Sequence, residues 1–292
     1  MIDSHSPPVI RQARDLLAGY DVIFSDVWGV VHDGLQANAG AMRALTAFRR
    51  RGGTVILVSN APVPPRRVAE MLDDRGVDRA SWDAIVSSGG LALEHVVASG
   101  YEAVYCIGPR DRDRAFFAAL AARPVALEAA EAVVCTGLEH DEIETVEDYR
   151  PVLDAARARA LPFVCANPDL VVDVGGRHYL CAGALAEAYE LSGGHVTWAG
   201  KPHPVAFEAA LREAQALRQS AIAPGRILAI GDAIRTDLKA AAGMGVDALF
   251  IASGIHRNDA MTGREIAPEK LARLFAHPGA PPATAAMAWF DW

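Results

Sequence analysis

Four short apolar runs in this chain each lead directly into polar or charged residues, and this pattern constrains the fold more than any other feature. Each run has the length and composition of a buried β-strand. Parallel sheets bind ligands outside the carboxyl ends of their strands, so the residues that follow the runs are predicted to meet in one crevice. Two carboxylates, a hydroxyl and an ammonium would meet there, a set that suits a phosphate ester and a divalent cation. The runs and the residues after them are Val22–Phe24 with Asp26, Val55–Val58 with Ser59 and Asn60, Val196–Trp198 with Lys201, and Ile227–Ile230 with Asp232.

Helical patterns alternate with these strands in the two ends of the chain. Strands separated by single helices predict parallel βαβ units with right-handed crossovers, and therefore an α/β fold with a doubly wound parallel sheet. The helices predicted on this basis are 39–51, 66–75, 203–219 and 235–242, and the strands are 20–25, 54–58, 226–230 and 248–251.

The middle of the chain carries its own strands and helices and has the size of a domain. We expect a core domain in two parts, residues 1–88 and 194–292, with an inserted α/β cap domain over residues 89–193. Gly89-Gly90 and Gly193-Gly194 bound this insertion and are candidate hinges. The proline-containing tail after residue 277 is expected to be irregular and packed by its aromatic residues.

The composition excludes several classes of function. The 292 residues are 51% hydrophobic and carry a formal net charge of −8, which argues against nucleic acid or an anionic membrane as the main partner. No apolar stretch approaches the roughly 18 residues of a membrane span, and the first eight residues do not resemble a signal peptide. The four cysteines are widely spaced, as expected for reduced thiols in a cytoplasmic protein rather than a zinc or redox site.

The ordered set of motifs resembles the haloacid dehalogenase superfamily, and the position of the insertion resembles its class IIA subgroup of phosphatases. The resemblance covers nearly the whole chain. It implies a Rossmann-like core with an inserted cap and a hydrolase that acts on a small phosphorylated metabolite. The motifs are Asp26-x-Trp28-Gly29-Val30, Leu57-Val58-Ser59-Asn60, Gly200-Lys201-Pro202, Gly231-Asp232-x-x-x-Thr236-Asp237 and Asn167-Pro168-Asp169.

The resemblance also implies roles for individual residues. Asp26 would be the nucleophile that forms an aspartyl phosphate, and Lys201 would neutralise charge between it and the phosphate. Asp26 and Asp232 would ligate Mg²⁺, together with the backbone carbonyl of Trp28. Asp237 would support these ligands without binding the ion itself. A site with oxygen ligands, at which the ion keeps several water molecules, is typical of magnesium.

Substrate contacts are implied for Ser59, Asn60, Trp28, Asn167 and Asp169. Local structure offers a simpler explanation for some of them. Serine is common in turns and at helix caps, which offers a structural role for Ser59, and Asn-Pro-Asp is a common turn at a strand end. Both interpretations remain open from the sequence.

Trp28 departs from the family pattern. Most phosphatases of this superfamily carry an aspartate two residues after the nucleophile, where it protonates the leaving group and then activates water. General acid–base catalysis is typically worth about 10²–10⁴-fold in rate. Tryptophan supplies neither function, so His32 and Asp33, just beyond the turn, are the local candidates for the proton donor.

The sequence therefore predicts a Mg²⁺-dependent phosphatase, with a homodimer as one option for its assembly. Two other interpretations stay open. A catalytically impaired protein that binds a phosphorylated metabolite would retain the phosphate and metal sites without turnover. A metal-independent dehalogenase would share the aromatic residue after the nucleophile, but dehalogenases typically lack the aspartate that stands here as Asp232.

Overall fold

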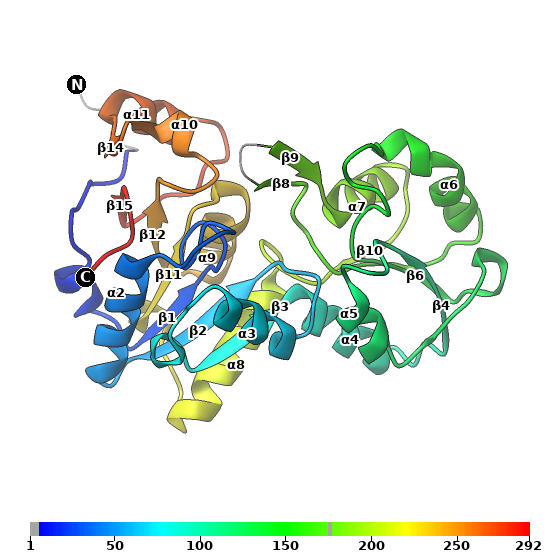
Figure 1. The fold of residues 1–292 in the computed structure, drawn as a ribbon, viewed down its shortest axis with the longest axis horizontal. Coiled ribbons are helices and arrows are strands. Elements are labelled where there is room, and N and C mark those ends of the chain that lie inside the picture. The colour runs from blue at the N-terminus through cyan, green and yellow to red at the C-terminus, as the bar shows by residue number, and fades with distance from the viewer. Residues whose placement is uncertain (1–5, 175–176) are drawn as a thin grey trace. The chain divides into compact units, whose positions relative to one another are not determined.

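The computed structural model describes residues 6–174 and 177–292, and the chain forms two compact α/β units (Figure 1). The first unit comprises residues 1–59, 69–86 and 207–292, and the second comprises residues 60–68 and 87–206. None of the helices built from the described residues has the length and apolar character that a bilayer crossing requires.

A six-stranded sheet forms the centre of the first unit, in the order β15-β12-β11-β1-β2-β3. β1 lies between β11 and β2 and is parallel to both, and β12 and β15 continue the parallel pairing on the β11 side. The strand order thus runs outward in both directions from β1, as in a doubly wound sheet. The strands are β1 (Val22–Ser25), β2 (Thr54–Ser59), β3 (Ala84–Ser87), β11 (Ile227–Gly231), β12 (Asp247–Ile251) and β15 (Ala285–Met287).

The central strands form the core of this unit because their side chains are apolar on both faces. Every residue of β1, β2 and β11 is buried, the pattern expected of a parallel sheet covered by helices. Phe24 contacts Phe207 edge-on, with ring centroids 5.3 Å apart. The helices with residues in this unit are α1 (Arg14–Leu17), α2 (Ala39–Arg50), α3 (Pro65–Asp74), α8 (Pro204–Arg218), α9 (Lys239–Met244), α10 (Arg257–Ala260) and α11 (Pro268–Phe275), and a short hairpin joins β13 (Met261–Thr262) to β14 (Glu265–Ile266).

The second unit contains a five-stranded parallel sheet in the order β10-β7-β6-β4-β5. Its core combines apolar residues of the strands and of α6 and α7. The strands are β4 (Ala103–Ile107), β5 (Arg123–Pro124), β6 (Ala132–Cys135), β7 (Phe163–Cys165) and β10 (Val196–Trp198), with an antiparallel pair, β8 (Val171–Val174) and β9 (Arg177–Leu180). The helices are α4 (Ser88–Ala98), α5 (Arg114–Ala119), α6 (Arg150–Ala158) and α7 (Ala182–Leu191).

The prediction that Val196–Trp198 shares a sheet with Val22–Phe24 is wrong. This strand, β10, pairs with β7 in the five-stranded sheet, so residues 194–206 group with the second unit. Only three residues form the strand, and an apolar run carries no information about which sheet it joins.

One further expectation differs from the structure. The tail is not wholly irregular, because Ala285–Met287 forms β15 at the edge of the six-stranded sheet. Gly89-Gly90, a candidate hinge, lies in the first turn of α4. A Cβ at Gly89 would stand 2.3 Å from the backbone nitrogen of Val63, so this glycine permits close packing.

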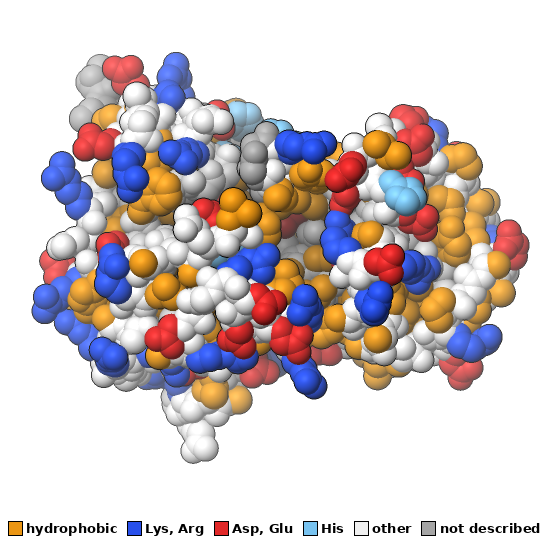
Figure 2. Space-filling view, in the orientation of Figure 1, with side chains coloured by type: hydrophobic (Ala, Val, Ile, Leu, Met, Phe, Trp, Pro, Cys, Tyr) orange, Lys and Arg blue, Asp and Glu red, His pale blue; other side chains and the backbone are white. Residues whose placement is uncertain are grey.

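Acidic and basic side chains of the described residues are interspersed over the face drawn in Figure 2. A surface on which positive and negative charges are mixed has only a weak overall attraction for anions. Any anion bound by this protein is therefore held by particular groups, as the net charge already indicated.

Candidate active site

The switch point of the six-stranded sheet places two carboxylates side by side. Asp26 follows β1 and Asp232 follows β11, and these two strands are neighbours with Ser25 opposite Ile230. The backbone N–H of Asp26 continues the ladder by donating to the carbonyl oxygen of Ile230 at 2.8 Å. Strand order reverses between β1 and β11, which is where open α/β sheets bind ligands.

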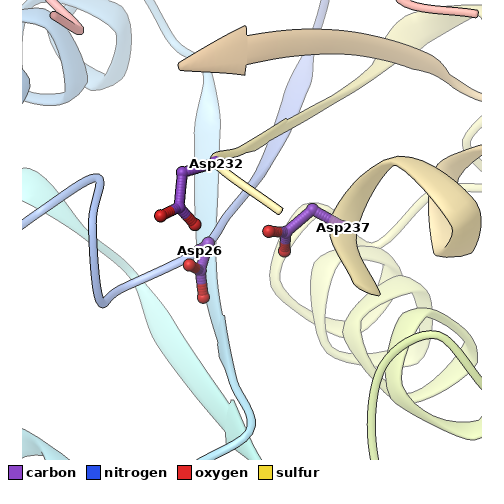
Figure 3. A group of neighbouring side chains, drawn as sticks. All are labelled: Asp26, Asp232 and Asp237. Atoms are coloured by element: carbon purple, nitrogen blue, oxygen red, sulfur yellow. The ribbon is translucent and has the colours of Figure 1, made fainter. Parts of the chain in front are cut away.

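A third carboxylate joins this pair. Asp26, Asp232 and Asp237 each offer an oxygen, and these oxygens all lie within 4.8 Å of one another. Figure 3 shows Asp26 and Asp232 at adjoining strand ends, with Asp237 turned toward them from the following helical turn. Three anionic groups this close repel one another, so a divalent cation would stabilise the arrangement, and hard oxygen ligands suit Mg²⁺ or Ca²⁺. The sequence predicted Asp26 and Asp232 as metal ligands with Asp237 in support, and the structure brings these three side chains together.

Two glycines and one backbone amide hold the carboxylate of Asp232. Its Oδ2 accepts a hydrogen bond from the backbone N–H of Ile255 at 2.7 Å. A Cβ at Gly29, whose φ is +87°, would lie 2.2 Å from this oxygen, and a Cβ at Gly254 would lie 1.8 Å from it. No other residue type leaves room for the carboxylate at either position. Gly254 and Ile255 were not predicted from the sequence, although Ser253-Gly254, just beyond the end of β12, was an available signal.

Asp237 is positioned by a π-helical turn, Ile234–Leu238. Its Oδ2 accepts from the backbone N–H of Ala233 at 3.1 Å, and its own N–H donates to the carbonyl of Ala233 at 3.0 Å. Gly231 again leaves the space, since a Cβ there would approach the side chain of Asp237 to 2.2 Å. π-helical turns are rare and often occur at functional sites. The structure therefore replaces part of the predicted helix 235–242 by a turn that orients Asp237.

Gly254→Ala is expected to weaken binding of Mg²⁺ at least tenfold. The added methyl group would displace Asp232, and loss of a group that orients a metal ligand typically costs 10–100-fold in affinity. Calorimetric titration of Mg²⁺ measures the effect. Gly225→Ala is the matched control, because nothing lies within 4 Å of a Cβ at Gly225, and this variant should bind Mg²⁺ like the wild type.

Trp28 packs within the turn that follows Asp26. Its ring lies edge-on to His32, with centroids 5.2 Å apart. A Cβ at Gly34, whose φ is +94°, would come within 2.6 Å of the indole, so glycine at this position makes room for the tryptophan. The half-buried indole thus has a packing role.

Neither local candidate for a proton donor is suited to that task at neutral pH. Burial, and then the nearby positive charge of Arg75, lower the pKa of His32 to about 4. Its Nδ1 accepts a hydrogen bond from the backbone N–H of Gly34 at 2.9 Å, which a neutral imidazole permits. For Asp33, burial favours a higher pKa, but hydrogen bonds from the backbone N–H groups of Gln36 and Leu35 outweigh it and lower the pKa. At neutral pH, His32 is thus uncharged and Asp33 is ionised.

Asn60 connects several segments of the second unit through its side-chain amide. Its Nδ2 donates to Oδ1 of Asp169 at 2.9 Å and to the carbonyl of Lys201 at 3.0 Å. Its Oδ1 accepts from the backbone N–H of Lys201 at 2.9 Å and from Oγ of Ser88 at 3.2 Å. These bonds use both donor hydrogens and both acceptor lone pairs of the amide. A direct substrate contact would require one of them to break.

The other predicted residues fall into two groups. Asn167 and Asp169 form the turn that the sequence offered as the simpler explanation, with Oδ1 of Asn167 accepting from the N–H of Asp169 at 3.2 Å. Lys201 is a buried lysine, 2% exposed. Ser59 ends β2 and is also buried. Burial of a lysine requires partners for its ammonium, which is consistent with a role at an anionic site.

The family models match both ends of the chain. Residues 23–120 match a model described as haloacid dehalogenase-like hydrolase, and residues 198–277 match one described as HAD-hydrolase-like. A crystal structure of a haloacid dehalogenase-like family hydrolase from Brucella suis 1330 is 40% identical, covers 96% of this chain and 99% of its own, and has a TM-score of 0.83. The chain belongs to the haloacid dehalogenase-like hydrolase family.

Solved structures with lower sequence identity share the fold. A 4-nitrophenylphosphatase from Thermotoga maritima has a TM-score of 0.71 at 19% identity, with 94% of this chain and 96% of that one covered. A glycerol phosphate phosphatase from Mycobacterium tuberculosis in complex with calcium has a TM-score of 0.64 at 23% identity, with coverage of 94% and 72%. The same phosphatase is also known in complex with magnesium. No curated protein sequence matches the chain.

Proposed function

We propose that this haloacid dehalogenase-like hydrolase is a Mg²⁺-dependent phosphatase of a small phosphorylated metabolite. The observation that carries the proposal is the group of three carboxylates at the switch point of the sheet, with oxygens within 4.8 Å of one another. Proteins of the same fold that are named as phosphatases support the choice of phosphate esters. The retained Asp232 disfavours the metal-independent dehalogenase.

In this mechanism a carboxylate oxygen of Asp26 bonds to the phosphorus atom as the ester P–O bond breaks, and the oxygen that leaves takes up a proton from water. Water then hydrolyses the aspartyl phosphate and releases inorganic phosphate. Lys201 and Ser59 keep the roles that the family pattern implies, charge neutralisation and binding of phosphoryl oxygens. Asp232 and Asp237, with Asp26 and the carbonyl of Trp28, would hold Mg²⁺, which neutralises phosphoryl charge when bound. The second unit is proposed to act as the cap that selects the leaving group and excludes water.

A panel of phosphate esters tests the function directly. The panel pairs an aryl ester, 4-nitrophenyl phosphate, with unactivated esters such as glycerol 3-phosphate, each assayed with Mg²⁺ and with a chelator. Metal-dependent release of inorganic phosphate is the expected result. Binding of phosphorylated ligands with Mg²⁺ but without turnover would instead support the catalytically impaired binding protein. That protein is the second candidate because the turn at residues 28–34 offers no suitable proton donor.

Trp28→Asp should accelerate hydrolysis of esters with basic leaving groups. Aspartate at this position would protonate the departing oxygen, a contribution of at most about 10²–10⁴-fold. Aryl esters need less protonation and should gain less. The cavity left by the indole reduces the benefit, so melting temperatures are compared as well. A lower rate of the variant on an unactivated ester that the wild type cleaves rapidly would show that another group supplies the proton.

A further inference from the structure

A pocket separate from the three carboxylates lies within the first unit. It has a volume of about 620 Å³ and is lined by the π-helical turn, the start of α9, the loop after β12 and α11. The side chains of Ile234 and Leu274 form the apolar part of the pocket wall. Small-molecule sites typically measure about 300–1,000 Å³, so the pocket has room for an organic ligand and not only for an inorganic ion.

The charge of this pocket contrasts with that of the whole chain. Four cationic side chains line it, Arg235, Lys239, Lys270 and Arg273, against a single carboxylate, Asp259. The chain as a whole carries a net charge of −8. Because the Debye length is about 8 Å at physiological ionic strength, the local charges decide which ligand binds. The pocket therefore favours an anion with more than one negative charge.

Two of these cations are placed to meet such a ligand. Lys239 and Arg273 form no ion pair with any residue that the structure describes. Lys270 is anchored, because its Nζ donates to the carbonyl oxygens of Asn258 at 3.0 Å and Met261 at 2.7 Å. One fixed ammonium and two exposed cations from different helices make a site that can close around a phosphate group.

A short loop connects this pocket to the metal-binding carboxylates. Ile255 donates its backbone N–H to Oδ2 of Asp232, and the next residue, His256, lines the pocket. Nε2 of His256 lies 3.5 Å from the backbone nitrogen of Ile234, at the start of the turn that orients Asp237. A ligand that shifts this loop would change the positions of two metal-binding side chains.

We propose that the pocket binds a small organic phosphate with an apolar body, and that its occupancy is coupled to metal binding through residues 254–256. The binding is independent of the proposed phosphatase activity, whereas the coupling rests on the metal site at Asp232. Coupling between two sites is reciprocal, so metal binding would alter the affinity for the organic phosphate by the same factor.

Phenylphosphonate is the probe, because its P–C bond resists phosphatases and, in a mildly alkaline buffer, it joins a dianionic head to an apolar ring. Calorimetry in the presence of a chelator compares the wild type with the double variant Lys239→Gln, Arg273→Gln. We expect at least a tenfold loss of affinity, since one charged hydrogen bond is worth about tenfold in binding. The double variant Arg11→Gln, Arg50→Gln removes two exposed cations outside the pocket and should bind like the wild type. Benzenesulfonate, with the same ring and one charge, should bind more weakly.

Identical isotherms for the wild type and the Lys239, Arg273 double variant would overturn the proposal, because the probe would then bind elsewhere. Hydrogen exchange provides a second measurement that needs no variant. In wild-type protein without metal, phenylphosphonate should slow exchange of the amides of residues 254–259 and 273–279. Unchanged exchange there would also overturn it. The coupling is tested by titrating Mg²⁺ with and without the probe. The dissociation constant for Mg²⁺ should differ at least fivefold between the two titrations of the wild type and should not differ in the double variant.

Discussion

Replacing Asp26 by Asn is expected to reduce hydrolysis of every accepted phosphate ester by at least about 10³-fold. An amide oxygen is a poor nucleophile, and loss of a covalent catalyst removes most of an enzyme's acceleration. The change is nearly isosteric, and the backbone N–H of Asp26 keeps its hydrogen bond to the carbonyl of Ile230. The melting temperature should therefore stay close to that of the wild type. Release of inorganic phosphate under saturating Mg²⁺ measures the effect.

Asp33→Asn is the matched control for this experiment. It removes a carboxylate from the same turn, where Asp33 accepts from the N–H groups of Leu35 and Gln36 and does not take part in the group of three carboxylates. Its activity should remain within about tenfold of the wild type, because the ionised Asp33 has no proton to give the leaving group and its Oδ1 is already engaged by two backbone N–H groups. Activity of Asp26→Asn at the level of this control would remove Asp26 as the nucleophile.

Asp232→Asn is expected to abolish the stabilisation of the protein by Mg²⁺. A ligand that binds only the folded state stabilises it by about 2.7 kcal/mol at 100 times its dissociation constant. Asparagine keeps an oxygen acceptor for the N–H of Ile255 but removes one of the charges that attract the cation. Thermal denaturation with increasing Mg²⁺ should shift the melting temperature of the wild type upward and leave that of the variant constant.

The metal-free proteins provide an additional test of the same site. Three carboxylates with oxygens within 4.8 Å repel one another without a cation. Asp232→Asn should therefore be at least as stable as the wild type in the presence of a chelator. Asp15→Asn, an exposed aspartate outside the site, should show the same dependence on Mg²⁺ as the wild type. Equal stabilisation of Asp232→Asn and the wild type by Mg²⁺ would place the metal elsewhere.

The sequence predicted those parts of the site that depend on strand ends. Asp26 and Asp232 were recognised because each follows a buried apolar run, and parallel strands bring their carboxyl ends to one edge. The α/β class followed from the alternation of strands and helices, and most element boundaries agree within a few residues.

The missed features depend on contacts between distant segments. The assignment of Val196–Trp198 to a sheet is decided by its pairing with β7, which periodicity does not encode. The glycine at 254 matters because a carboxylate from another strand lies beside it. Its place after a strand end was a signal, but the local sequence does not tell which side chain it faces. The hydrogen bonds of the Asn60 amide to residues more than a hundred positions away, and to Ser88, were not predicted, and its contact with substrate stays a prediction.

The pairing of β1 with β11 has a consequence for the order in which the protein is made. Val22 lies opposite Ile227, so about 200 residues, including the whole second unit, are synthesised between the two strands. Domains generally fold as units during synthesis, and the second unit is complete before β11 leaves the ribosome. Until then β1 lacks its neighbour β11, and a nascent chain that ends before residue 232 lacks one of the three grouped carboxylates.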